Sequence, residues 1–128
     1  MRWLRRLVVP PAIVLAAGAC FLHHGSPDTG EAYTAPATLH VENHNWSDVS
    51  IIVLHDGQRT RLGIVTATSS KSFVFPRYLL GNLGEIRLIA DAIGSRDQTI
   101  TDVVVLRPGT RVTWTLEDDL VRSNLTVY

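Results

Sequence analysis

Apolar and polar side chains alternate along the chain from Ala37 onward, and this alternation is the feature that most constrains the fold. In the segment RVTWTLE (111–117), the residues Val, Trp and Leu occupy every second position. The segment TLHVENHN (38–45) places Leu39 and Val41 in the same phase. Side chains at every second position share one face of a β-strand, so this pattern predicts strands with one buried and one solvent-facing side.

Further short apolar segments follow and are separated by turn residues. The segment DVSIIVLHD (48–56) is apolar on both faces, which suits a central strand. Asp56-Gly57 after it is a strong hairpin signal, and PGT (108–110) also predicts a hairpin-like turn. RYLLGNLG (77–84) predicts a bulging connection. We predict strands within the segments 38–45, 48–56, 60–66, 72–76, 85–93, 98–107, 111–117 and 124–128.

Short strands at this spacing, without a convincing helix, favour an all-β fold. We predict an antiparallel β-sandwich of about seven strands, immunoglobulin-like or transthyretin-like, rather than a barrel. Because the chain has one cysteine, Cys20, it cannot form an internal disulfide, and the fold must rest on its apolar core. The segment 37–128 is long enough for such a core. The stretches VENHNWSDVSIIVL and RPGTRVTWTL resemble small uncharacterised bacterial β-sandwich domains, a resemblance that implies no activity.

Residues 1–19 have the composition of a signal peptide. Three arginines lie within MRWLRR, and the apolar run LVVPPAIVLAAGA (7–19) follows. This run is shorter than the ~20 residues that span a bilayer, and Pro10 and Pro11 each remove a backbone donor from a helix. The small residues at its end suit cleavage by a signal peptidase.

The sequence AGAC (17–20) resembles the lipobox of bacterial lipoproteins, in which small residues precede an invariant cysteine. The resemblance implies that the sulfur of Cys20 receives a diacylglycerol, that the chain is cut just before Cys20, and that this residue begins the mature protein. Ala17 stands where the family usually has leucine. Phe21 follows the cysteine where an aspartate would favour the inner membrane, so the resemblance implies the periplasmic side of the outer membrane.

Two other readings of the N-terminus stay open. Ala17-Gly18-Ala19 also fits ordinary secretory cleavage, which would give a secreted protein with a free thiol. The run could instead remain as an uncleaved anchor with a buried cysteine. The predicted organisation is a signal peptide over 1–19, a lipidated cysteine and flexible tether over 20–36, and a β-sandwich over 37–128. The tether holds two Pro and two Gly within FLHHGSPDTGEAYTAP.

Charge excludes one class of partner. The chain has 12 basic and 12 acidic residues. Because three of the basic residues lie at the N-terminus, the remainder is mildly acidic. A nucleic-acid-binding surface needs a clustered positive field, so we expect no nucleic-acid partner.

The first candidate for a binding residue is Trp46, which lies in the polar turn NHNWSD. With Asn43 and Asn45 beside it, an exposed indole could stack on a sugar or anchor a partner protein. The alternative is that the ring folds back and caps the end of the sandwich. Arg77 and Tyr78, in the connection after Pro76, are a second candidate for partner or glycan contact.

The other polar clusters do not predict chemistry. His40 and His44 are separated by ~13 Å along a strand, too far for them to chelate one ion together. His55, on a neighbouring strand, could reach one of them only if the register allowed it. The run Glu117–Asp119 lacks the loop and glycine of a calcium site and predicts a solvated turn. No local catalytic signature is present, so we predict no metal, no cofactor and no enzymatic activity.

These observations lead to a functional hypothesis. We expect a lipid-anchored protein of the cell envelope whose sandwich binds an envelope protein as an adaptor. Loops at one end of the sandwich, including Trp46 and the Asp56-Gly57 turn, would make the contacts. One alternative is a glycan-binding module that uses Trp46, and another is a secreted enzyme. The sequence leaves the oligomeric state open.

Overall fold

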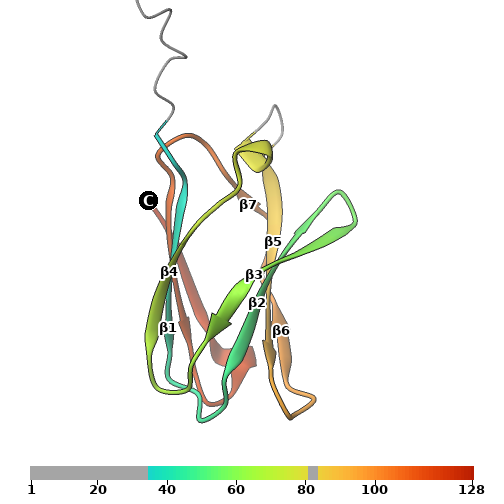
Figure 1. The fold of residues 1–128 in the computed structure, drawn as a ribbon, viewed down its shortest axis with the longest axis vertical. Helices are drawn as coiled ribbons and strands as arrows, with labels where there is room; N and C mark the ends of the chain where they lie inside the picture. Colours follow the sequence, from blue (N-terminus) through green and yellow to red (C-terminus); the bar gives the residue numbers. More distant parts are fainter. Residues whose placement is uncertain (1–34, 81–83) are drawn as a thin grey trace, which may run out of the picture. The chain divides into compact units, whose positions relative to one another are not determined.

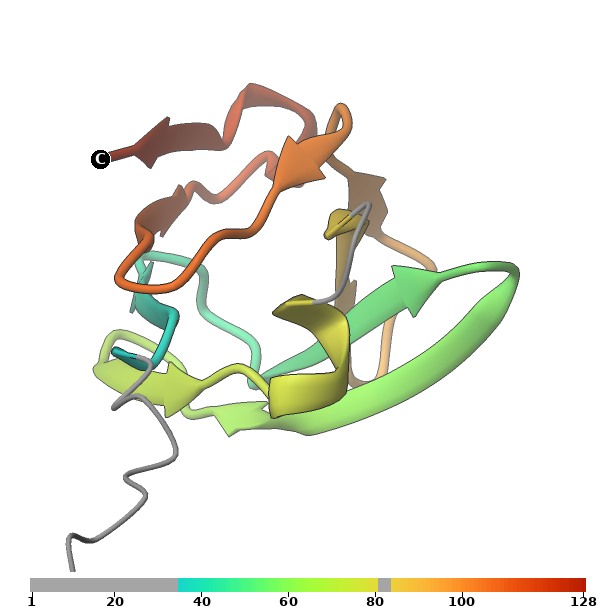
Figure 2. The same cartoon turned by 90° about the horizontal axis from the view of Figure 1, so that it is seen from above.

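The computed structural model describes residues 35–80 and 84–128, which form two β-sheets facing each other (Figures 1 and 2). The predicted signal peptide, Cys20 and all of the tether before Ala35 lie outside the described residues. The strands are β1 Thr38–Asn43, β2 Val49–His55, β3 Gln58–Val65, β4 Ser70–Val74, β5 Glu85–Ala92, β6 Gln98–Ile100, β7 Val104–Val105, β8 Arg111–Leu116 and β9 Asn124–Val127. Two short 3-10 helices, η1 Arg77–Leu80 and η2 Leu120–Arg122, complete the described elements. The predicted all-β sandwich is therefore confirmed, with nine strands in place of about seven.

The first sheet has the strand order β4-β1-β8-β9. β1 is antiparallel to β4 but parallel to β8, with Thr38 opposite Arg111 and Asn43 opposite Leu116. This parallel pair corrects the prediction of a wholly antiparallel sandwich. A hairpin would force neighbouring strands to be antiparallel, but β1 and β8 are joined through the strands between them, so they are free to run in the same direction.

The second sheet has the order β3-β2-β5-β6, and β7 pairs with the beginning of β5. β2 lies between β3 and β5, as its apolar sequence predicts. The hairpin between β2 and β3 turns at Asp56 and Gly57, which have φ values of 49° and 75°. Positive φ at both central residues belongs to the type I′ turn, whose twist matches that of the flanking strands. The prediction of a hairpin at this dipeptide is confirmed.

The segment predicted as one strand over 98–107 is instead split into β6 and β7. The backbone N–H of Leu88 donates to Oγ1 of Thr101 at 3.0 Å, and the N–H of Thr101 donates to the carbonyl of Leu88 at 2.9 Å. Because the threonine hydroxyl takes the place of a backbone acceptor, the chain can leave the ladder at Asp102 and return at Val104. After Val105 the chain crosses to the other sheet, so PGT connects two sheets and is not a hairpin turn.

The predicted alternation is confirmed in the core. Val112, Trp114 and Leu116 of β8 are at most 1% exposed, and Leu39 and Val41 of β1 are fully buried against them. From the second sheet, Ile51, Val53, Ile86, Leu88 and Ala90 join the same cluster. Each 3-10 helix adds one buried leucine, Leu79 or Leu120.

Candidate functional site

The loop between β1 and β2 exposes Trp46, which is 81% accessible to solvent. The ring therefore does not fold back over the core, which was the alternative considered from the sequence. An indole held this far into solvent has its face free for a ligand or a partner.

Asn43, predicted to contact a ligand beside Trp46, is instead 1% exposed and fastens the loop from within. Its Nδ2 donates to the carbonyls of Ser47 at 3.0 Å, Val65 at 3.2 Å and Thr66 at 3.1 Å. Its Oδ1 accepts from the backbone N–H of Asn45 at 2.9 Å. A side-chain amide carries both donors and an acceptor, so it can satisfy backbone groups that no strand partner reaches.

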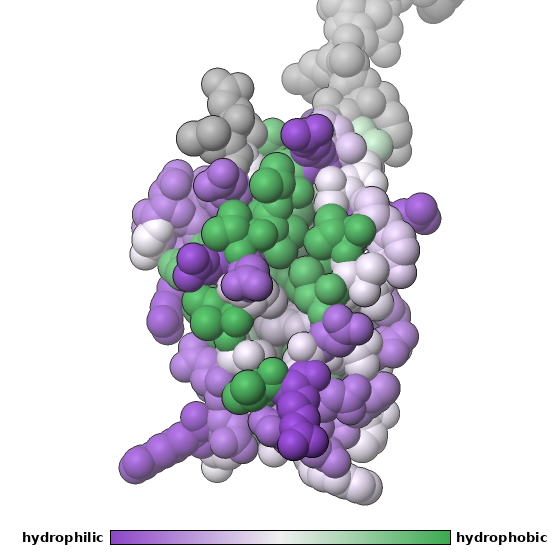
Figure 3. Space-filling model, turned by 180° about the vertical axis from the view of Figure 1, so that it is seen from behind, coloured by the Kyte–Doolittle hydropathy of each residue, from purple (hydrophilic) through white to green (hydrophobic). Residues whose placement is uncertain are grey.

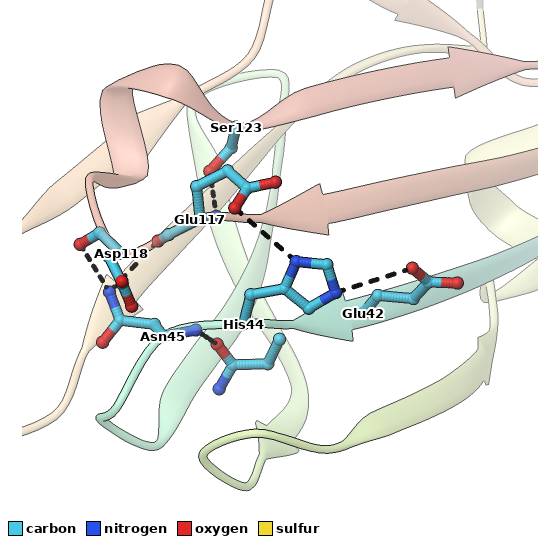
Figure 4. A network of polar contacts seen from close by, with 7 residues as sticks. Glu42, His44, Asn45, Glu117, Asp118 and Ser123 are labelled. Carbon is cyan, nitrogen blue, oxygen red and sulfur yellow. Dashed lines mark hydrogen bonds and ion pairs between the residues drawn. The ribbon is translucent and has the colours of Figure 1, made fainter.

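Asn45 is likewise 7% exposed and is not a contact residue. Its Oδ1 accepts from the N–H of Ser47 at 2.9 Å, and its Nδ2 donates to the carbonyls of Glu117 at 3.2 Å and Asp118 at 2.9 Å (Figure 4). The prediction that Asn43 and Asn45 bind a ligand is therefore wrong for both. Their hydrogen bonds fasten the loop that carries Trp46 to the end of β3 and to the turn after β8.

Histidines and carboxylates form a row on the outer face of the first sheet, and Figure 4 shows its part made by Glu42, His44 and Glu117. Nε2 of His40 lies 3.7 Å from Oε1 of Glu42, and Nε2 of His44 lies 3.9 Å from Oε2 of the same carboxylate. Nδ1 of His44 lies 3.5 Å from Oε2 of Glu117. His40 also contacts the hydroxyl of Ser72 at 2.9 Å. These contacts become ion pairs when the imidazoles are protonated, but all four side chains are about half exposed, and such pairs contribute little.

His55 lies far from this row because β2 belongs to the other sheet. Its Nδ1 lies 3.1 Å from the carbonyl of Glu85, and its Nε2 lies 3.2 Å from Oδ2 of Asp56. Within residues 35–80 and 84–128, no three His, Cys, Asp or Glu side chains gather as metal ligands would. Nor does any helix in this part of the chain have the length and apolar character needed to cross a membrane.

Arg77 and Tyr78, the second predicted contact pair, lie on the exposed surface of η1, and Tyr78 is 62% exposed. The Tyr78 hydroxyl lies 3.3 Å from Oγ1 of Thr60. Tyr78 also borders a cleft of about 440 Å³ with His55, Asp56, Glu85 and Arg87. This cleft combines polar groups of both charges with the apolar side chains Leu54, Ile86 and Val103.

The predicted cluster of Trp46 with the Asp56-Gly57 turn is wrong. The loop that carries Trp46 precedes β2, and the turn follows it, so the seven residues of β2 separate them. At the usual rise per residue, that strand is ~20 Å long. The two candidates therefore lie at opposite ends of the sandwich and cannot contact one small partner surface.

A further surface feature is an apolar face on the side of the sandwich where the two sheets are open (Figure 3). A groove of about 350 Å³ lies there between the β6–β7 segment and β9 with η2, and buried Trp114 also borders it. Its walls carry exposed apolar side chains, of which Val121 is 79% exposed and Val103 is 49% exposed. We call this surface the open-side face; its apolar members are Ile100, Val103, Val121, Leu125 and Val127.

Sequence reasoning did not identify the open-side face. Its members come from three separate segments, and each segment by itself resembles an ordinary strand or turn. The one local signal is the run VVV (103–105), which is longer than a half-buried alternating strand needs. A contiguous apolar patch on a protein surface commonly marks an interaction site.

Comparison with known proteins adds little to this description. No family model matches the chain, and no curated protein matches it. Among solved structures, the chain is similar to a protein from Eubacterium rectale determined by NMR, with a TM-score of 0.41 and 17% sequence identity. The match covers 73% of this chain and 86% of that one.

Proposed function

We propose that this protein is a lipid-anchored binding module of the cell envelope, which acts as an adaptor for a partner protein. The open-side face supports the binding role, because exposed apolar side chains from both sheets converge there around a groove. The resemblance of AGAC to a lipobox supports the anchor at Cys20.

The two parts have separate roles in this proposal. The lipid on Cys20 attaches the chain to a membrane, and two or more acyl chains make such an attachment stable. Sixteen residues such as those of the stretch 21–36 would span roughly 20–25 Å if they formed a flexible coil, and this would keep the sandwich clear of the lipid headgroups. The open-side face would then be available to a protein in the envelope.

The anchor is tested by comparing wild type with Cys20→Ala in the native host. We expect the wild-type protein to partition into detergent, to begin at Cys20 and to carry acyl mass, and we expect the variant to lose all three properties. A wild-type protein that is water-soluble and carries no lipid would refute the anchor and leave a secreted binding module.

The binding role is tested by site-specific photo-crosslinking in the same cells. A photoreactive residue at position 121 should give a discrete protein adduct, because Val121 is the most exposed member of the open-side face. The matched control is position 74 on β4, since Val74 is also apolar and is 63% exposed. Equal adducts from both positions, or none from position 121, would refute an adaptor role for this face.

A second candidate function is the binding of an envelope glycan through Trp46. The observation that favours it is the combination of 81% exposure with a loop fastened by Asn43 and Asn45. A rigid exposed indole can stack on a sugar ring without losing much conformational freedom. Sedimentation with purified cell-wall polysaccharide should then require Trp46 and be lost in Trp46→Ala, whereas Tyr78→Ala should retain it.

A further inference from the structure

The strand β9 leaves half of its backbone groups pointing away from its sheet. Among the described residues, β9 pairs with β8 alone. Tyr128 and Arg111 exchange both backbone hydrogen bonds, at 2.8 and 3.2 Å. Such pairs alternate along an antiparallel ladder. Leu125 and Val127, which lie opposite Trp114 and Val112, therefore direct their N–H and C=O groups toward the open side.

The side chains of these two residues also face the groove. Their partners Trp114 and Val112 are core residues of β8, and residues opposite each other in a ladder share one face of the sheet. A strand added beside β9 would therefore extend the first sheet from four strands to five. Every second side chain of that strand would enter the groove between β9 and the opposite wall.

The opposite wall is a second open edge. The N–H of Ala92 donates to the carbonyl of Asp97, and the N–H of Thr101 donates to the carbonyl of Leu88. By the same alternation, Gln98 and Ile100 of β6 direct their backbone groups away from β5. On this edge Ile100 and Val103 are 48% and 49% exposed, and Thr99, Thr101 and Asp102 add polar groups to the same wall.

The charged residues that line the groove and the hollow beside it are all acidic. Asp102 borders the groove, and Asp97, Asp118 and Asp119 line the hollow that adjoins it at Val121. Neither lining includes Lys or Arg. Arg122 of η2 pairs with one of these carboxylates, since its Nε lies 3.6 Å from Oδ2 of Asp119. Because Asp118 and Asp119 precede β9 closely in the chain, the carboxylates gather near its first residue.

We propose that the open-side face binds an extended basic segment of a partner protein, which pairs with β9 as an added strand. This proposal rests on the adaptor function proposed above and names the chemistry of the partner. The segment alternates apolar and polar residues, so that its apolar side chains fill the groove. Lys or Arg follows at the end that lies beside the start of β9. Main-chain hydrogen bonds to Leu125 and Val127 supply affinity, and the carboxylates select the partner.

The same charges argue against two other occupants. In a second copy of this chain the strand β9 is NLTV and carries no Lys or Arg, so it would not supply the cations that the carboxylates select. An anionic membrane surface would repel the same carboxylates. The experiment must therefore be able to detect binding of either occupant.

The test uses the full chain in a non-ionic detergent and synthetic peptides in which Val alternates with Thr. One pair of peptides ends in two Lys residues, at the N-terminus or the C-terminus, and a matched pair ends in two Glu residues. We expect one Lys peptide to bind, with amide NMR shifts at Leu125 and Val127, and the Glu peptides to bind at least about tenfold more weakly. The Lys peptide that binds better reports the direction of the added strand.

Two controls separate strand addition from simple apolar contact. N-methylation of alternate peptide amides on the edge facing β9 should abolish binding, whereas N-methylation on the other edge should leave it within about twofold, since only the first set donates to the protein. Val121→Gln should weaken binding several-fold, and Val74→Gln should leave it unchanged. Neither substitution removes a buried group.

Several results would overturn the proposal. These are equal binding of Lys and Glu peptides, binding that survives N-methylation of either edge, association of the chain with itself through this face, or binding to vesicles containing phosphatidylglycerol in place of peptide. A crosslinked protein from position 121 together with no peptide binding would leave the adaptor function in place and refute strand addition alone.

Discussion

The side-chain amide of Asn45 donates to the backbone carbonyl of Asp118 at 2.9 Å, which joins the loop before β2 to the turn after β8. Seventy-three positions separate these residues in the chain. The same amide also reaches Glu117, and its oxygen accepts from Ser47. One asparagine thus fixes the position of the loop that carries Trp46, and its contribution to stability can be measured.

Asn45→Ala should lower the free energy of unfolding by about 2–3 kcal/mol, because it leaves several part-buried backbone groups without partners. Urea unfolding of the full chain measures the change. Asn124→Ala is the control, since Asn124 is exposed on β9, and its effect should stay within about 0.5 kcal/mol. Equal effects of the two substitutions would contradict a fastening role for Asn45.

Truncation to alanine should cost much stability at one of the two described tryptophans and very little at the other. Trp114→Ala removes a side chain that is 1% exposed and should cost about 3–5 kcal/mol. Trp46→Ala removes one that is 81% exposed and should change stability by less than about 0.5 kcal/mol. Thermal and urea unfolding measure both values. A large loss in Trp46→Ala would mean that its ring packs on the protein in solution.

Two glycines should differ in their tolerance of alanine for separate reasons. Gly57 has a φ of 75°, but nothing lies within 4 Å of an added Cβ, so Gly57→Ala should cost only about 1–2 kcal/mol of backbone strain. At Gly84 an added Cβ would clash with the backbone carbonyl of Leu106, and Gly84→Ala should cost about 3 kcal/mol or more. Unfolding midpoints in urea would rank the pair. The reverse order would refute the close approach of Leu106 to Gly84.

Thr101→Val tests the hydroxyl that interrupts the strand over 98–107. The substitution keeps the shape of the side chain but removes the acceptor for the N–H of Leu88, so it should cost about 1–3 kcal/mol and speed hydrogen exchange at that amide. Thr113→Val on the outer face of β8 is the matched control and should be close to neutral. Unchanged exchange at Leu88 would show that the hydroxyl is dispensable.

Much of the fold follows from local sequence. Strict alternation placed Val112, Trp114 and Leu116 in the core, because the period of a strand leaves each side chain only two faces. Asp56-Gly57 specified its own turn, since few residues adopt positive φ at both central positions. These features depend on neighbours in the chain, and the sequence displays those neighbours directly.

The binding surfaces were predicted less well. Trp46 was identified as a candidate because a large ring is unusual in a polar turn, and the structure places it in solvent. Asn43 and Asn45 have the same polar character as contact residues, and only burial distinguishes a residue that fastens a loop from one that binds a ligand. Almost nothing in the local sequence indicates the open-side face.

The sequence by itself determined most of the segments that form strands, which side chains of β1 and β8 are buried and where the tightest turn lies. Only the tertiary structure decided that β1 runs parallel to β8, that β2 separates Trp46 from the Asp56-Gly57 turn, and that Val103, Val121 and Val127 border one groove. The physical reason is that strand order and pairing depend on contacts between residues far apart in the chain. Local patterns determine which face of each strand is buried, whereas the packing of all the strands together determines which strands are neighbours.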